Sequence, residues 1–271
     1  MLSFFHNFAP QAILLSFGWL KIYWYGLFVV SGIIAAMATA RHYWKKVGLE
    51  AKLFDDLSFL LIIFGLIGAR VYEWFLSYPY YSQYPGELLK IWHGGLAIHG
   101  AIIGAFLALW WFSRKHRLSL AKICAIIVPG LALGQAIGRF GNYFNQELFG
   151  WPTNLPWGIF ISPENRPIEL QQFAFFQPTF LYESMLCLLL FLLLILLKKR
   201  FAHQNLLVIG SYLCGYGLIR FFLEYLRIDL TPQFIGLRWP QFISIILFII
   251  GSTLLYLNFF NHRHEKRTTK N

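Results

Sequence analysis

Residues 187–197 read Cys-Leu-Leu-Leu-Phe-Leu-Leu-Leu-Ile-Leu-Leu and contain no charged side chain. A strand of a membrane barrel would alternate apolar and polar residues, and this run does not alternate. The run indicates a helix that crosses a bilayer, for which about 20 mostly apolar residues are needed. Of the 271 residues, 58% are hydrophobic and 13% are charged, whereas soluble proteins average about 25% charged. We therefore expect an all-α polytopic membrane protein.

Seven membrane spans are predicted, at about residues 19–40, 57–76, 92–112, 119–137, 179–197, 205–226 and 239–260. Basic residues gather in alternate connections and in the tail: Arg41, Lys45, Lys46, Lys52, Arg114, Lys115, Arg117, Lys122, Lys198, Lys199, Arg200, Arg263, Lys266, Arg267 and Lys270. The positive-inside rule assigns this side to the cytoplasm. The N-terminus is then expected outside and the C-terminus in the cytoplasm. The net charge of +11 indicates contact with anionic membrane lipid rather than with nucleic acid.

The connection at 138–178 is much longer than the others and contains five prolines. Connections of this length are usually functional or form a small folded cap. We expect a single integral-membrane domain over residues 1–271, with this segment as its extracytoplasmic cap.

Residues 138–150 read Gly-Arg-Phe-Gly-Asn-Tyr-Phe-Asn-Gln-Glu-Leu-Phe-Gly, at the end of an apolar segment. Polar and charged side chains at membrane depth are unfavourable unless they have partners or a function. The three glycines predict a backbone that turns tightly and approaches a ligand. We interpret the segment as the wall of an active site for a lipid headgroup.

Charged residues outside the cytoplasmic set lie near the outward ends of the spans and are expected to meet in one polar chamber: Arg70, Glu73, Arg139, Glu147, Glu183, Arg220, Glu224 and Arg227. Tyr216, Arg220, Glu224 and Arg227 have the spacing of one helix face. An ion pair that only stabilises the helix bundle would explain this face. A phosphate-binding Arg220 oriented by Glu224 would explain it too, because a guanidinium bonds two phosphate oxygens at once.

Two histidines and a tyrosine complete the set of candidates. His93 and His99 are poorly aligned on a helix, so a shared metal is not expected. His99 is either a hydrogen-bonded core residue or a general base, since imidazole titrates near neutral pH. Tyr25 is either an aromatic anchor at the membrane interface or a hydroxyl donor to a headgroup.

The stretch 138–150 resembles the signature of the prolipoprotein diacylglyceryl transferases, Gly-Arg-x-Gly-Asn-aromatic-x-Asn-x-Glu-x-x-Gly, at every fixed position. Further similarities run along the chain: Trp24-Tyr25-Gly26, Gly68-Ala69-Arg70, Gly94-Gly95-Leu96, His99-Gly100, Leu181-Tyr182-Glu183, and Tyr216-Gly217 through Arg220 to Glu224. The resemblance implies a multi-pass enzyme of the bacterial inner membrane whose active site faces the extracytoplasmic side.

The implied reaction moves the diacylglyceryl group of phosphatidylglycerol to the lipobox cysteine beside the signal peptide of a prolipoprotein. A thioether forms and glycerol-1-phosphate leaves, as the first step of lipoprotein maturation. No cofactor, metal or nucleotide is implied.

The resemblance also implies which residues do this. The catalytic residues would be His99, Arg139, Glu147, Arg220 and Glu224. Phosphatidylglycerol would be bound by Tyr25, Arg139, Asn142, Asn145, Gly150, Tyr216 and Arg220. The two arginines would hold the phosphate, while His99 would help to deprotonate the thiol.

One position departs from the family pattern. Many members carry a histidine before the Pro-x-x-Leu-Tyr-Glu element, where this chain has Gln177, so a catalytic histidine at that place is not available here. The rival hypothesis is a transporter or flippase for an anionic lipid, which would use the same arginines without chemistry. Transporters often contain inverted repeats, and none is evident in the sequence.

Overall fold

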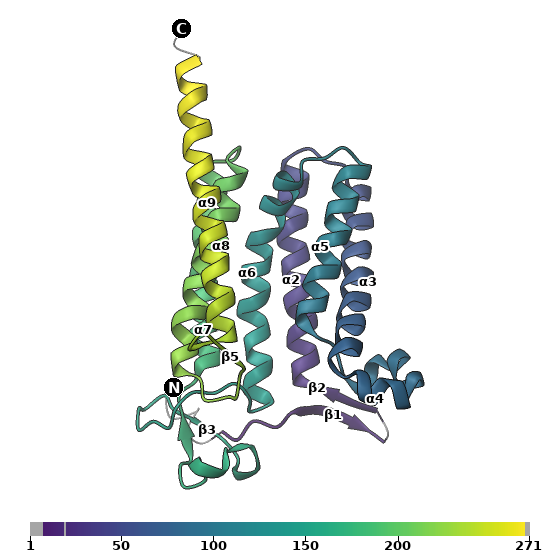
Figure 1. The fold of residues 1–271 in the computed structure, drawn as a ribbon, viewed down its shortest axis with the longest axis vertical. Helices are drawn as coiled ribbons and strands as arrows, with labels where there is room; N and C mark the ends of the chain where they lie inside the picture. The colour runs from purple at the N-terminus through teal and green to yellow at the C-terminus, as the bar shows by residue number, and fades with distance from the viewer. Residues whose placement is uncertain (1–7, 19, 269–271) are drawn as a thin grey trace. The chain divides into compact units, whose positions relative to one another are not determined.

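The apolar segments fold as long helices (Figure 1). The structure is a computed structural model and describes residues 8–18 and 20–268. The long helices are α2 (Trp24–Lys46), α3 (Ala51–Leu76), α5 (Ile98–Lys115), α6 (Leu120–Phe144), α7 (Thr179–Arg200), α8 (Asn205–Leu223) and α9 (Trp239–Thr268).

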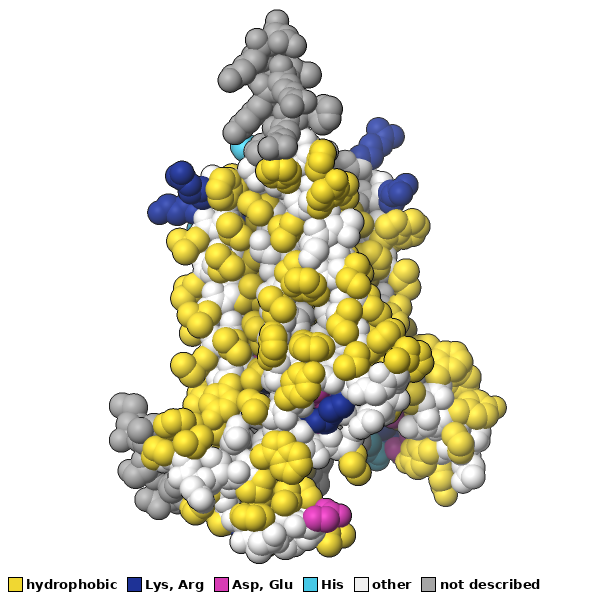
Figure 2. Space-filling view, turned by 60° about the vertical axis from the view of Figure 1, so that its left-hand side comes forward, with side chains coloured by type: hydrophobic (Ala, Val, Ile, Leu, Met, Phe, Trp, Pro, Cys, Tyr) yellow, Lys and Arg dark blue, Asp and Glu magenta, His cyan; other side chains and the backbone are white. Residues whose placement is uncertain are grey.

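Six of these helices are long and apolar enough to cross a membrane, namely α2, α3, α6, α7, α8 (counted with the turn after it) and α9. Helix α5 is not among them; it has 18 residues, including His99, Arg114 and Lys115. Large apolar side chains stay exposed along the helices, for example Leu189 at 60% and Leu196 at 63% on α7, and Figure 2 shows them covering the helices on one face. The chain is therefore a helical multi-pass membrane protein.

Short elements connect the long helices. In the part of the chain that the structure describes, the strands form three antiparallel pairs, β1 (Ile13–Phe17) with β2 (Leu20–Tyr23), β3 (Ile159–Phe160) with β4 (Phe175–Phe176), and β5 (Gln233–Phe234) with β6 (Leu237–Arg238). The same residues also form the shorter helices α4 (Tyr78–Gln83), η1 (Pro85–Leu89), η2 (Ile91–His93), η3 (Pro163–Asn165), η4 (Ile168–Leu170) and η5 (Glu224–Leu226).

Contacts group the chain into two compact units, residues 1–40 with 127–271, and residues 41–126. The expectation of a single domain stays a prediction. In the first unit, α2 approaches α6 where two glycines meet, since a Cβ on Gly32 would lie 2.8 Å from the carbonyl oxygen of Gly134. Helices α8 and α9 lie side by side (Figure 1). They are also close at two glycines, since a Cβ on Gly210 would lie 2.8 Å from the carbonyl oxygen of Gly251. Small residues at these crossings permit close helix packing in lipid.

The second unit is built on α3 and α5. A Cβ on Gly100 would lie 2.1 Å from the carbonyl oxygen of Gly68, and one on Gly104 would lie 2.1 Å from that of Phe64. Gly100 and Gly104 therefore permit a close approach of α3 and α5. These glycines fix the distance between the two helices.

The segment between α6 and α7 has a small core of its own. Tyr143, Phe149, Ile159, Ile161, Phe176 and Phe180 are all buried in it. Gln146 ties this core to the N-terminal segment, because its amide nitrogen donates to the carbonyl of Pro10 at 2.7 Å and its amide oxygen accepts from the N–H of Ser162 at 2.6 Å. In the first unit this folded segment lies at the end of α6 and the beginning of α7 (Figure 1).

Two predictions are wrong at glycine residues. Helix α6 continues through Gly138 and Gly141 to Phe144, and the predicted turn at these glycines does not occur. The turn follows instead at Gln146 and Leu148, whose φ angles are 52° and 57°. The third helix begins at Ile98 rather than at residue 92, because Gly94 and Gly95 have φ angles of 87° and 71° and interrupt the helix.

Candidate active site

Two arginines from different helices share one carboxylate. Nη2 of Arg139, on α6, lies 2.7 Å from Oε1 of Glu183, and Nη1 of Arg220, on α8, lies 3.1 Å from Oε2 of the same residue. The side chain of Glu183, near the beginning of α7, is only 4% exposed. A buried carboxylate needs such partners, because an unpaired charge at this depth is strongly destabilising. Glu183 therefore holds the two guanidinium groups next to each other.

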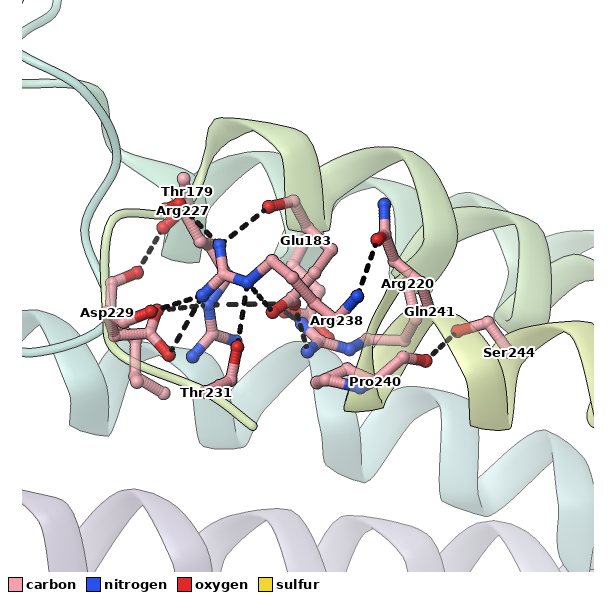
Figure 3. A network of polar contacts seen from close by, with 12 residues as sticks. Thr179, Glu183, Arg220, Arg227, Asp229, Thr231, Arg238, Pro240, Gln241 and Ser244 are labelled. Carbon is pink, nitrogen blue, oxygen red and sulfur yellow. Dashed lines mark hydrogen bonds and ion pairs between the residues drawn. The ribbon is translucent and has the colours of Figure 1, made fainter. Parts of the chain in front are cut away.

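A second buried carboxylate extends the contacts. Glu224 is fully buried; its Oε2 lies 2.9 Å from Nη2 of Arg220, and its Oε1 lies 3.2 Å from Nε of Arg238. Arg227 pairs with Asp229 at 2.7 Å (Figure 3), and it lies 3.9 Å from Glu224. We call this set of directly paired side chains the arginine network: Arg139, Arg220, Arg227, Arg238, Glu183, Glu224 and Asp229.

Two signature residues, Asn142 at the end of α6 and Glu147 in the turn after it, lie next to the network. Asn142 lies one turn after Arg139, and its Oδ1 accepts a hydrogen bond from Nη1 of that arginine at 3.2 Å. The Nδ2 of Asn142 donates to Oε1 of Glu147 at 2.7 Å. Because both groups of the amide are used, the orientation of Asn142 is defined. Glu147 itself is exposed, so its carboxylate remains open to a ligand.

Both predicted tyrosines lie beside this group. Tyr216 interacts electrostatically with Arg139. Tyr25 interacts electrostatically with Glu147 and Arg139. The ring of Tyr25 packs on α6 at Gly141, where a Cβ on the glycine would lie 2.9 Å from Cδ2 of the tyrosine. The missing side chain at 141 therefore lets Tyr25 approach the site.

Gly150 and Asn145 have backbone roles in the structure. The N–H of Gly150 donates to the carbonyl of Gln177 at 2.9 Å, and a Cβ on Gly150 would lie 2.7 Å from the carbonyl oxygen of Leu226. The N–H of Asn145 donates to the carbonyl of Gly141 at 3.1 Å. Contacts of either residue with phosphatidylglycerol stay predictions.

His99 lies in the second unit, on the first turn of α5, and its side chain is exposed. The alternative of a buried core histidine is therefore wrong. Its ring lies 5.9 Å from the ring of Tyr72, measured between centroids. His93 lies outside α5, in η2, so the two histidines do not share a helix. Whether His99 acts as a base stays a prediction.

The loop before α5 is organised by Arg70. Its guanidinium donates to the carbonyl oxygens of Glu87, Leu88, Lys90, Gly94 and Gly95. Arg70 thus uses its donors within its own unit. In the same loop, hydrogen bonds from Lys90 and His93 lower the pKa of Glu87.

Sequence reasoning assigned no catalytic or binding role to four members of the network, namely Glu183, Arg227, Asp229 and Arg238. Glu183 was expected in the polar chamber. The sequence feature that indicates its pairing is a carboxylate at the start of a long apolar run, where a charge needs a partner. Asp229 and Arg238 lie in a connection without an obvious motif. Their pairing depends on the folding of the β5–β6 connection against η5, which residue spacing does not reveal.

A cavity of about 300 Å³ lies between α3 and α5, in the second unit. It is lined by Leu60, Phe64, Leu107, Ala108, Trp110 and Trp111. Its walls are apolar and offer nothing to orient a headgroup. The arginine network, which belongs to the first unit, is therefore the better candidate for the chemistry.

Comparison with known proteins identifies the family of the chain. Residues 12–257 match the family model described as prolipoprotein diacylglyceryl transferase. The chain belongs to this family. It is 40% identical over 248 residues to a protein of Synechococcus elongatus named phosphatidylglycerol–prolipoprotein diacylglyceryl transferase, covering 90% of this chain and 86% of that one. A protein of Synechocystis sp. with the same name is 39% identical, covering 92% and 90%.

Membership of this family makes the chain a transferase enzyme. The family assignment favours the transferase hypothesis over the transporter hypothesis. The arginine network contains Arg139 of the family signature together with Arg220 and Glu224 of the later motif. Three segments that are distant in the sequence, at 139, 183 and 220–224, thus meet in the first unit.

Proposed function

We propose that the protein transfers the diacylglyceryl group of phosphatidylglycerol to the lipobox cysteine of a prolipoprotein. The single observation that carries this proposal is the pair Arg139 and Arg220, held together by Glu183 at 2.7 and 3.1 Å. Paired guanidinium groups suit a phosphodiester, because each offers several N–H donors in one plane. The names of the relatives supply the donor and acceptor classes.

The reaction is a displacement at the glycerol carbon that carries the phosphate. The thiol loses its proton, the sulfur attacks this carbon, and a C–S bond forms while the C–O bond to the phosphate breaks. The electron pair of that bond goes to the phosphate oxygen, and glycerol-1-phosphate leaves. Arg139 and Arg220 stabilise the charge that grows on the phosphate.

The other site residues have supporting roles in this proposal. Tyr25, Asn142, Asn145, Gly150 and Tyr216 bind or border the lipid headgroup. Glu147 accepts hydrogen bonds from the glycerol hydroxyls or orients Asn142, and Glu224 orients Arg220. His99 takes the thiol proton, although neighbouring arginines also lower the pKa of a thiol.

The proposed placement in the cell follows from charge and from the family. The protein spans the inner membrane seven times, with its N-terminus outside and its C-terminus in the cytoplasm. The site faces the extracytoplasmic half of the bilayer, where the lipobox of an exported precursor emerges. Phosphatidylglycerol enters laterally from the lipid, and the signal peptide binds beside it.

An in vitro transfer assay tests the proposal. The purified protein is incubated with phosphatidylglycerol micelles and a lipobox peptide, and products are measured by mass spectrometry. We expect a peptide carrying a diacylglyceryl thioether and an equal amount of glycerol phosphate. A peptide with serine in place of the cysteine is the matched control. If correctly folded protein forms neither product, the transporter hypothesis would be favoured instead.

A further inference from the structure

Arg238 and Arg220 pair with different oxygens of Glu224. We propose that Arg238 is a positioning residue for phosphate binding, because its pairing with Glu224 leaves Arg220 able to bond a phosphodiester. This inference rests on the proposed function and adds a residue to the same site. Figure 3 shows Arg220 and Arg238 within one network of polar contacts.

The two oxygens of Glu224 have different partners. Oε2 lies 2.9 Å from Nη2 of Arg220, whereas Oε1 lies 3.2 Å from Nε of Arg238. Glu224 is fully buried, so water does not stabilise its charge. Arg227 is farther away, at 3.9 Å, and is paired with Asp229. Arg238 is therefore the main cation for Oε1.

The donors of Arg238 are used within the protein. Nε donates to Oγ1 of Thr231 at 2.7 Å, and Nη1 donates to the carbonyls of Glu224 and Arg227 at 3.1 and 2.6 Å. Nη2 donates to the carbonyl of Asp229. A guanidinium has five N–H donors, so Arg238 has little capacity left for a ligand. It acts through Glu224 and the connection at 227–238.

Arg220 differs from Arg238 in this respect. Among the described residues, its hydrogen bonds go from Nη1 to Glu183 and from Nη2 to Glu224. Donors on the same guanidinium therefore remain for a phosphate. Its side chain is 12% exposed, compared with none for Glu224.

Loss of Arg238 would change how Arg220 is used. Oε1 of Glu224 would lose its cation, and charge interactions are strong where water is excluded. The nearest mobile cation is Arg220, which would be drawn into a two-oxygen pair with Glu224. An anionic lipid would then compete with a full carboxylate for the same guanidinium, and it would bind less tightly.

A double-mutant cycle tests this coupling. Binding of phosphatidylglycerol in detergent micelles is measured with the full-length purified protein, for the parent, Arg238→Met, Glu224→Gln and the double variant. We expect Arg238→Met to weaken binding about tenfold when Glu224 is present. In the Glu224→Gln background, the same change should weaken binding less than threefold, because no carboxylate remains to capture Arg220. Equal losses in both backgrounds would overturn the proposal.

Thr231→Val is the matched control for loop anchoring. It removes one hydrogen bond of Arg238 but no charge, so binding should stay within twofold of the parent. If Thr231→Val weakened binding as much as Arg238→Met, Arg238 would only anchor the loop and the proposal would fail.

Folding and function are separated in the same series. Should Arg238→Met not fold, the charge argument requires the double variant to fold, since it leaves no buried carboxylate at 224. A double variant that also fails to fold would contradict the charge argument. Binding is measured without turnover, so a parent protein that binds the lipid but makes no thioether refutes the proposed function, while the cycle still decides the role of Arg238.

Discussion

Arg139 and Arg220 lie on different helices and bind opposite oxygens of a single carboxylate, that of Glu183. Had each arginine been paired with an acidic neighbour on its own helix, their function would have been structural. The shared carboxylate instead fixes two cations side by side before any substrate is present. Preorganised cations stabilise developing charge without rearranging during the reaction.

The first prediction concerns these two arginines. Arg139→Ala and Arg220→Ala should each lower the rate of transfer by roughly 100-fold or more, as expected for the loss of a preorganised donor. Glu183 retains one guanidinium in either variant, so the protein should still insert in the membrane. Thioether formation is measured together with size-exclusion profiles. Near-normal rates in both variants would exclude the phosphate role.

Glu183→Gln should separate binding from catalysis. The amide keeps the size of the side chain but removes the charge that holds the guanidinium groups together. We expect a lower KM for phosphatidylglycerol, because the site becomes more positive, and a kcat about tenfold lower, as for other losses of positioning. Steady-state kinetics with a saturating lipobox peptide measures both. A lower kcat with a raised KM would mean that Glu183 only supports the fold.

Gly150→Ala should disrupt the contact between η5 and the beginning of α7. The added Cβ would lie 2.7 Å from the carbonyl of Leu226 and 3.0 Å from Thr179, so backbone must move. We expect a lower melting temperature and a large loss of activity. Gly138→Ala is the matched control, since its Cβ meets nothing within 4 Å and alanine favours a helix by about 0.5–1 kcal/mol. A stable Gly150→Ala protein would argue against this packing role.

His99→Gln tests the general base. Glutamine keeps a hydrogen-bonding side chain but does not take up a proton near neutral pH. The transfer rate should fall by about 100-fold, within the range for general bases, and should recover in part at high pH, where the thiol ionises unaided. The pH profile of kcat/KM measures this. An unchanged rate at neutral pH would remove His99 from the mechanism.

Acid should loosen the loop that precedes α5. Hydrogen bonds from Lys90 and His93 lower the pKa of Glu87 from its usual value of 4.5. A carboxyl whose pKa is lower in the folded state stabilises that state above its unfolded pKa, and the stabilisation disappears as the pH falls through the folded pKa. The difference in melting temperature between the parent and Glu87→Gln should therefore be constant at neutral pH and shrink below pH 4.5. A difference in melting temperature that does not depend on pH would contradict the stabilising role of the ionised Glu87.

Much of the fold follows from apolar runs and glycine positions. The long helices lie where the hydrophobic segments predict them, because each must satisfy its backbone hydrogen bonds in lipid. The ends of α5 and α6 were less predictable. Gly94 and Gly95 adopt positive φ angles while Gly138 and Gly141 remain helical, and only tertiary packing distinguishes these two pairs.

The site was partly predictable for a similar reason. Arg220 near the end of α8 and Glu224 at the start of η5, which follows directly, are four residues apart, so their ion pair follows from helix geometry. The bridge from Glu183 to Arg139 joins two helices, and Arg238 reaches Glu224 from an irregular connection. Contacts of this kind depend on how segments pack, which the spacing of residues along one chain does not encode.

The contact between Gly141 and Tyr25 has a consequence for variation among related sequences. A hydrogen atom at position 141 leaves room for an aromatic ring from another helix, with 2.9 Å between Cδ2 and the place of a Cβ. The two positions should therefore evolve together: a homologue with alanine at the place of Gly141 should have a smaller or displaced side chain at the place of Tyr25. A library that randomises both codons at once should return more active clones than libraries that randomise either codon alone.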